Sequence, residues 1–106
     1  MTPQTVLDFW FAEENRPFQF SRNDGFDAQI RAQFFDIWQQ AALGELSHWR
    51  DTLQGRLAEI IILDQFSRNL FRDSPQAFAQ DTAALILAQE ACLLYTSDAA
   101  DDLTRL

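Results

Sequence analysis

Apolar residues recur every three or four positions between residues 26 and 41, and this spacing constrains the fold more than any other feature. The stripe consists of Phe26, Ile30, Phe34, Ile37, Trp38 and Ala41. Such a period matches the 3.6-residue turn of an α-helix with one buried face. Asp24 and Asp27 occupy capping-box positions at its start. Gly44 stands where a helix usually ends.

Three further helices are predicted by the same reasoning. The first begins at Pro3 after the capping residue Thr2, and the third runs from Asp51 or Thr52 to about Asn69. Ser74-Pro75 opens the fourth, which ends at about Cys92. The first helix has the apolar stripe Val6, Leu7, Trp10 and Phe11, and the fourth has Ala77, Phe78, Ala84, Leu85 and Ala88.

The rest of the pattern favours an all-α fold. No alternation typical of a strand is visible, and only three Gly and three Pro interrupt the 106 residues. Short connections between consecutive helices predict antiparallel helical hairpins, packed in a bundle or a solenoid.

Charge and composition exclude several classes of function. The net charge is -8, so neither nucleic acid nor an anionic membrane is an expected partner. All eight basic residues are Arg. One Cys and one His cannot form a disulfide framework or a metal site, and no cofactor is predicted. The longest apolar run, Ile60 to Leu63, is too short to span a membrane, and Met1 to Phe11 lacks the pattern of a secretory signal. A cytoplasmic protein is expected.

The segment from Leu63 to Arg72 carries charges on a helix that is otherwise apolar nearly all round. On a regular helical wheel, Asp64 and Arg68 fall on the same side as the apolar residues Leu57, Ile61 and Phe71. A buried charge costs several kcal/mol unless it is paired and hydrogen-bonded. We therefore expect Arg68 or Arg72 to bridge Asp64 and Asp81.

Neighbouring polar residues complete this expected cluster. Asn69 would supply further hydrogen bonds, and Gln65 lies beside it in a parallel stripe. The candidate site residues are thus Asp64, Gln65, Arg68, Asn69, Arg72 and Asp81. The cluster can be a structural lock between two helices, or a pocket in which Arg side chains hold an anionic or carboxylate ligand. Asp64 or Asp81 acting as a general base is a third reading.

Order and spacing along most of the chain are similar to those of a known family. The residues concerned are Val6 to Phe11, Phe26-Asp27, Ile30-Arg31, Ala42, Gly44-Glu45-Leu46, Trp49, Gly55 to Ala58, Leu63 to Arg72, Ala77-Phe78-Ala79 and Asp81. From about Val6 to Ala91 the chain resembles the bacterial family called domain of unknown function 924. The resemblance implies a tetratricopeptide-like helical superhelix without an assigned activity. Gln19 and Ser67 depart from its usual Trp and Pro.

The family also has a second half with a Met-His-Ser-Glu-type motif, which has no counterpart here. The stretch from Cys92 to Asp101 back-translates, in one frame, into a string similar to the end of a transposon-based sequencing adapter. We therefore expect residues 1–91 to be a partial domain and residues 92–106 to be a non-native tail. The alternative is an ordinary helix end followed by a short acidic helix, Ser97 to Leu106.

The functional expectation is a helical binding module for a protein, a peptide or a small acidic ligand, which rests on fold analogy. The alternative is an enzyme whose site combines Asp64, Arg68 and Asp81 with residues of the missing half. The missing half would cover apolar faces of these helices. Because these faces are uncovered in the partial domain, we expect self-association.

Overall fold

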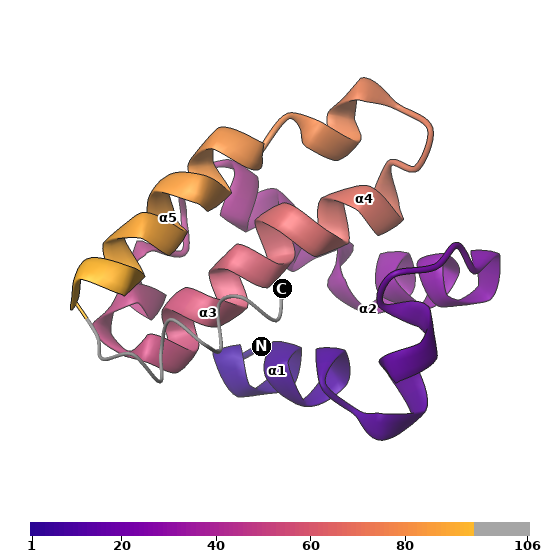
Figure 1. Ribbon diagram of the computed structural model, residues 1–106, viewed down its shortest axis with the longest axis horizontal. Helices are drawn as coiled ribbons and strands as arrows, with labels where there is room; N and C mark the ends of the chain where they lie inside the picture. The colour runs from indigo at the N-terminus through magenta and orange to yellow at the C-terminus, as the bar shows by residue number, and fades with distance from the viewer. Residues whose placement is uncertain (95–106) are drawn as a thin grey trace.

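One long helical segment lies at the centre of the structure, a computed structural model that describes residues 1–94 (Figure 1). This segment, the central helix, consists of α3 (Leu53–Ile61), the π turn η3 (Ile62–Phe66) and α4 (Ser67–Leu70). Its bounds agree with those predicted for the third helix. The π turn within it was not predicted.

Three other α-helices pack around the central helix. α1 (Pro3–Trp10) contacts α3, α2 (Asp24–Ala42) contacts η3 and α4, and α5 (Asp81–Leu94) contacts α3 and η3. Short 3-10 turns lie between them, namely η1 (Glu13–Phe18), η2 (Ser47–Asp51) and η4 (Pro75–Phe78). Residues 1–94 contain no strand, so the all-α fold class is confirmed. The tetratricopeptide-like arrangement stays a prediction.

Aromatic side chains fill the core where these helices meet. Trp10 of α1, Phe34 of α2 and Phe66 of η3 are among the largest fully buried side chains. The ring centroids of Phe34 and Phe66 are 4.9 Å apart, and those of Trp10 and Phe66 are 5.9 Å apart. Such pairs contribute about 0.5–1.5 kcal/mol beyond their burial. Phe66 therefore ties the π turn to two other helices.

The helix ends follow the predicted signals at Thr2 and Gly44 but not at Asp24. Thr2 caps α1, and Gly44 has a φ of 75°, the left-handed conformation that commonly ends a helix. The prediction that Asp24 caps α2 is wrong. Asn23 is the capping residue, because its backbone is extended and its side chain accepts a hydrogen bond from the Phe26 N–H at 2.9 Å.

The predicted fourth helix is interrupted. Ser74 caps the 3-10 turn η4, and α5 begins only at Asp81. This break shifts the helical register. The prediction that Phe78 and Leu85 belong to the buried stripe is therefore wrong, because both side chains are exposed. The buried residues of α5 are Ala84, Leu87 and Ala91. The predicted stripe of α1 is likewise wrong at Phe11, which follows the last helical residue and is 44% exposed.

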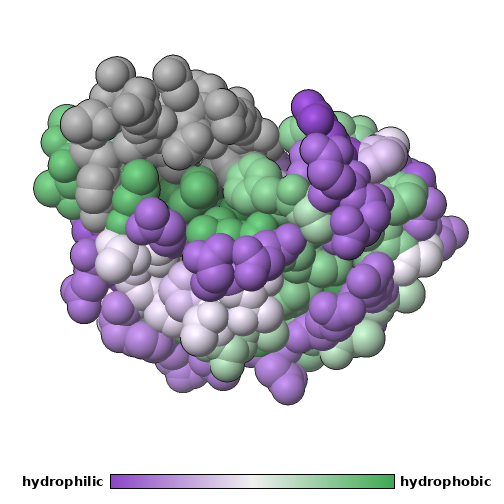
Figure 2. Space-filling model, turned by 90° about the horizontal axis from the view of Figure 1, so that it is seen from below, coloured by the Kyte–Doolittle hydropathy of each residue, from purple (hydrophilic) through white to green (hydrophobic). Residues whose placement is uncertain are grey.

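The surface of residues 1–94 is mixed in character. Seen from below, apolar side chains gather in an area that hydrophilic side chains border (Figure 2). On α5, Leu85, Ile86, Leu93 and Leu94 are exposed. Self-association through such faces stays a prediction. None of the helices in this range has the length and apolar character needed to cross a membrane.

The predicted boundary at residue 91 falls within α5, which continues through Cys92 to Leu94. The remainder of the predicted tail, and the alternative acidic helix from Ser97, lie outside the described residues.

Candidate functional site

The π turn η3 determines which way the charged residues of the central helix face. A π turn contains one residue more than an α-helical turn, so the side chains after it are rotated relative to a regular wheel. Ser67 lies at its end, where its hydroxyl donates to the Leu63 carbonyl at 2.7 Å and accepts from the Trp38 indole N–H at 2.9 Å. The predicted burial of Asp64 and Arg68 is wrong: Asp64, within the π turn, and Arg68, after it, have side chains that are 27% and 35% exposed.

Arg68 bridges the two acids that the sequence predicted for it. Its Nη1 lies 2.8 Å from Asp64 Oδ1 and also donates to the Asp64 carbonyl. Its Nη2 lies 3.4 Å and 3.5 Å from the two carboxylate oxygens of Asp81, at the start of α5. The Arg68 guanidinium also lies 5.2 Å from the centre of the Phe78 ring. The bridge to Asp64 is thus tight and the bridge to Asp81 is long.

Arg72 and Asn69 have a different partner from the predicted one. Both bind Asp27 of α2: Arg72 through two hydrogen bonds of 2.7 Å and 2.9 Å, and Asn69 through one of 2.9 Å. Both residues point away from Asp64 and Asp81, because the rotation after the π turn directs them toward α2. The central helix is therefore fixed to α2 and α5 by two separate polar clusters.

Sequence reasoning assigned Asp27 to a helix cap and missed this role. Asp27 precedes Ile30 by three residues and Phe34 by seven, which places it on the inner side of α2 and could have revealed it. Burial raises the pKa of Asp27, but hydrogen bonds from Arg72 and Asn69 and the charges of Arg72 and Arg22 outweigh burial. The net effect is a pKa below the ordinary value.

A second ion pair also escaped sequence reasoning. Glu59 of α3 is completely buried, and Arg50 of η2 donates to both of its carboxylate oxygens at 2.9 Å. The only sequence signal was a Glu directly before the apolar run from Ile60 to Leu63. This pair fastens the loop before α3 to the helix, and it lies apart from the predicted cluster.

Two adjoining clefts expose the predicted residues. The central cleft, of about 380 Å³, is lined by Gln19, Phe20, Ser21, Arg22, Asp64, Gln65, Arg68, Asn69 and Arg72. The adjoining cleft, of about 410 Å³, is lined by Arg68, Arg72, Asp73, Ser74, Pro75, Ala77 and Phe78. Five of the six predicted residues thus face the central cleft. Asp81, the sixth, does not line this cleft and is connected to it only through its contact with Arg68. Within the cleft, the Gln65 amide donates a hydrogen bond to Asp64 at 2.6 Å.

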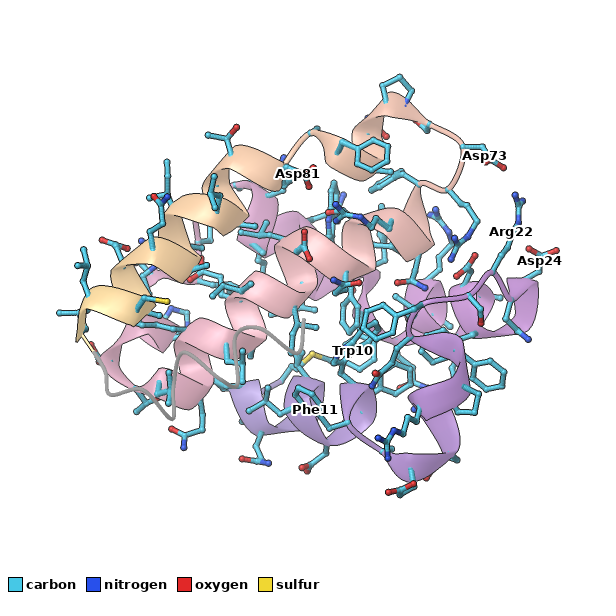
Figure 3. The ribbon with its side chains drawn as sticks, in the orientation of Figure 1. Trp10, Phe11, Arg22, Asp24, Asp73 and Asp81 are labelled. Carbon is cyan, nitrogen blue, oxygen red and sulfur yellow. The ribbon has the colours of Figure 1, made fainter. Side chains whose placement is uncertain are left out.

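Arg22, from the loop before α2, was not predicted as part of the site. Its Nη1 lies 2.7 Å from Asp73, and its Nε lies 3.6 Å from Asp24 (Figure 3). The Arg22 side chain is 58% exposed. It therefore adds a third, accessible guanidinium to the central cleft. A guanidinium in such a position can hold a carboxylate or a phosphate through paired hydrogen bonds.

Metal chemistry has no visible basis in this part of the chain. Residues 1–94 contain no group of three or more His, Cys, Asp or Glu side chains placed to hold a metal ion. The enzyme alternative depends on groups outside this chain and stays a prediction.

The described residues form an all-helical protein with an Arg-lined surface cleft on its central helix. The chain belongs to the family described as "Bacterial protein of unknown function (DUF924)", whose model matches residues 6–105. This result confirms the resemblance found in the sequence.

A solved structure is similar to the chain over 92% of its length. It is the protein of unknown function ATU0120 from Agrobacterium tumefaciens, with a TM-score of 0.79 and 29% sequence identity. The chain spans 57% of the length of that protein. No curated protein matches the chain.

Proposed function

We propose that this protein is a binding module that takes a protein or peptide segment, or a small acidic ligand, on its helical surface. Arg68 anchors the ligand in the central cleft. A cytoplasmic location and a tetratricopeptide-like arrangement of helices are parts of the same proposal. The observation that carries it is the position of Arg68, which lines both adjoining clefts and holds Asp81 only loosely.

Exposure of the cluster supports a site rather than a buried lock. An internal lock would be closed to water on all sides, whereas the side chains of Arg68 and Asp81 are 35% and 43% exposed. Partly exposed ion pairs contribute little to stability, on the order of 0–1 kcal/mol. Arg68 can therefore exchange its contact with Asp81 for a ligand carboxylate at little cost.

The test is a calorimetric titration of the protein with succinate, a simple dicarboxylate. Arg68→Met should abolish the binding heat while leaving the protein folded by circular dichroism. Arg16→Met is the matched control, because the Arg16 side chain is 77% exposed and lines neither cleft. Succinamide, which has the same shape without charge, should not bind. Unchanged binding by Arg68→Met, or unfolding of this variant, would contradict the proposal.

A further inference from the structure

Three clefts follow one another along the surface and share their lining residues. A cleft of about 740 Å³, lined by Phe11, Glu13, Arg16, Gln19 and Phe20, meets the central cleft at Gln19 and Phe20. The central cleft in turn shares Arg68 and Arg72 with the cleft beside Phe78. The three clefts are therefore neighbours along the surface, and we call them together the three-part groove.

Bulky aromatic side chains lie on both sides of the central cleft. On one side are Phe11, which is 44% exposed, and Phe20, which is 73% exposed and stands where the first cleft meets the central cleft. On the other side is Phe78, which is 59% exposed. Exposed phenylalanines in a hollow are typical of surfaces that bind the apolar side chains of a partner. Apolar side chains on two sides suit a ligand that is long enough to reach both.

Arginine side chains recur along the groove. Four of the chain's eight Arg residues line it, Arg16, Arg22, Arg68 and Arg72, and each of them pairs with an acid of the protein. Two of these pairings are weak. Arg68 lies 3.4 Å and 3.5 Å from the Asp81 oxygens, and the side chains of Arg22 and Asp73 are 58% and 71% exposed. Acidic groups of a ligand can therefore replace the protein's own acids at Arg68 and Arg22, in the middle of the groove.

We infer that the three-part groove binds an extended peptide segment of a partner protein, in which acidic residues are flanked on both sides by bulky apolar residues. The acids bind the guanidinium groups in the central cleft, and the apolar side chains pack on Phe11 and Phe20 on one side and on Phe78 on the other. This inference rests on the proposed function and names its ligand. A small acid would occupy only the central cleft.

The experiment uses fluorescein-labelled peptides of about twelve residues, roughly 40 Å long when extended. One peptide has glutamates in the middle and leucines at both ends, a second replaces the leucines with serines, and a third replaces the glutamates with glutamines. Fluorescence anisotropy should show that the first peptide binds about tenfold or more tightly than either of the others.

Variants assign each part of the peptide to a part of the groove. Phe20→Ala and Phe78→Leu should each weaken the first peptide by about fivefold to tenfold without changing the binding of the second peptide. The Phe78→Leu substitution keeps an apolar side chain at this position and removes the ring beside Arg68. Leu43→Ala is the control, because Leu43 is 75% exposed and lies outside the groove. Arg68→Met should weaken the first and second peptides equally.

The outcomes separate this inference from the proposed function. If succinate binds but the first peptide binds no better than the second, the inference fails and the proposed function stands. If neither succinate nor any glutamate peptide binds, both fail. Equal binding of the glutamate and glutamine peptides would indicate a merely apolar surface and would overturn the inference as well.

Discussion

Arg50 donates a hydrogen bond of 2.9 Å to each carboxylate oxygen of Glu59, whose side chain is completely buried. Arg50→Met should therefore destabilise the protein by about 3 kcal/mol, because it leaves a buried negative charge without a partner. Urea unfolding followed by circular dichroism measures this loss. The double variant Arg50→Met, Glu59→Met removes both charges and should recover most of the stability. A double variant no more stable than Arg50→Met would contradict this account.

The two helical glycines should respond oppositely to alanine. A Cβ at Gly55 would lie 1.7 Å from the Trp49 carbonyl oxygen, so Gly55→Ala must displace backbone and should cost about 1–3 kcal/mol or more. At Gly25 the nearest atom is Oδ1 of the capping residue Asn23 at 3.3 Å, which has to shift by only a few tenths of an ångström and can keep its hydrogen bond from the Phe26 N–H. Gly25→Ala should then be neutral or stabilise by up to about 1 kcal/mol. Thermal unfolding of both variants checks the contrast, which equal losses would refute.

Asp27 should make the protein sensitive to acid. Its pKa in the folded state lies below the ordinary value of 3.8, so its contribution to stability is fully present above that value. The contribution is lost as the pH falls through the lower pKa of the folded state. The difference in unfolding free energy between the wild type and Asp27→Asn should therefore shrink below about pH 4. Urea unfolding at several pH values measures it, with the exposed Asp36→Asn as the control.

Arg68 and Arg72 should differ in their importance for folding, although both face the central cleft. Arg72 makes two short hydrogen bonds to Asp27, whose side chain is only 14% exposed, so Arg72→Met should cost about 2–3 kcal/mol. Arg68 has more exposed partners, and Arg68→Met should cost about 1 kcal/mol or less. Chemical denaturation of the two variants side by side provides the measurement. A larger loss for Arg68→Met would favour the lock reading.

Local signals predicted the helices well because each depends on a few neighbouring residues. Thr2, Thr52 and Gly44 end or begin helices through contacts within one turn, and such contacts are visible in the sequence. The bridge by Arg68 was also foreseeable, because Asp64 lies one helical turn away and Asp81 follows after a short connection.

Long-range pairing could not be predicted in the same way. Arg72 binds Asp27, which lies on α2 and precedes it by 45 residues in the chain. Which of Asp27, Asp64 and Asp81 becomes the partner of Arg72 depends on how the helices pack. The π turn adds a second difficulty, because a helical wheel assumes regular α-helical turns and so places the residues after the π turn on the wrong face. The clefts depend on Gln19 to Arg22, a loop whose position no periodic pattern encodes.

The π turn also has a consequence for comparing sequences within the family. Because this turn holds one residue more than an α-helical turn, deleting one residue between Ile62 and Phe66 would restore regular α-helical geometry and leave the segments on either side facing nearly as they do now. Glu59 and Arg68 would then keep their present neighbours. A relative aligned with a single gap in this segment should accordingly retain both the anchor for the loop before α3 and the Arg-lined cleft, whereas a gap elsewhere in the central helix would turn one of them away by roughly 100°.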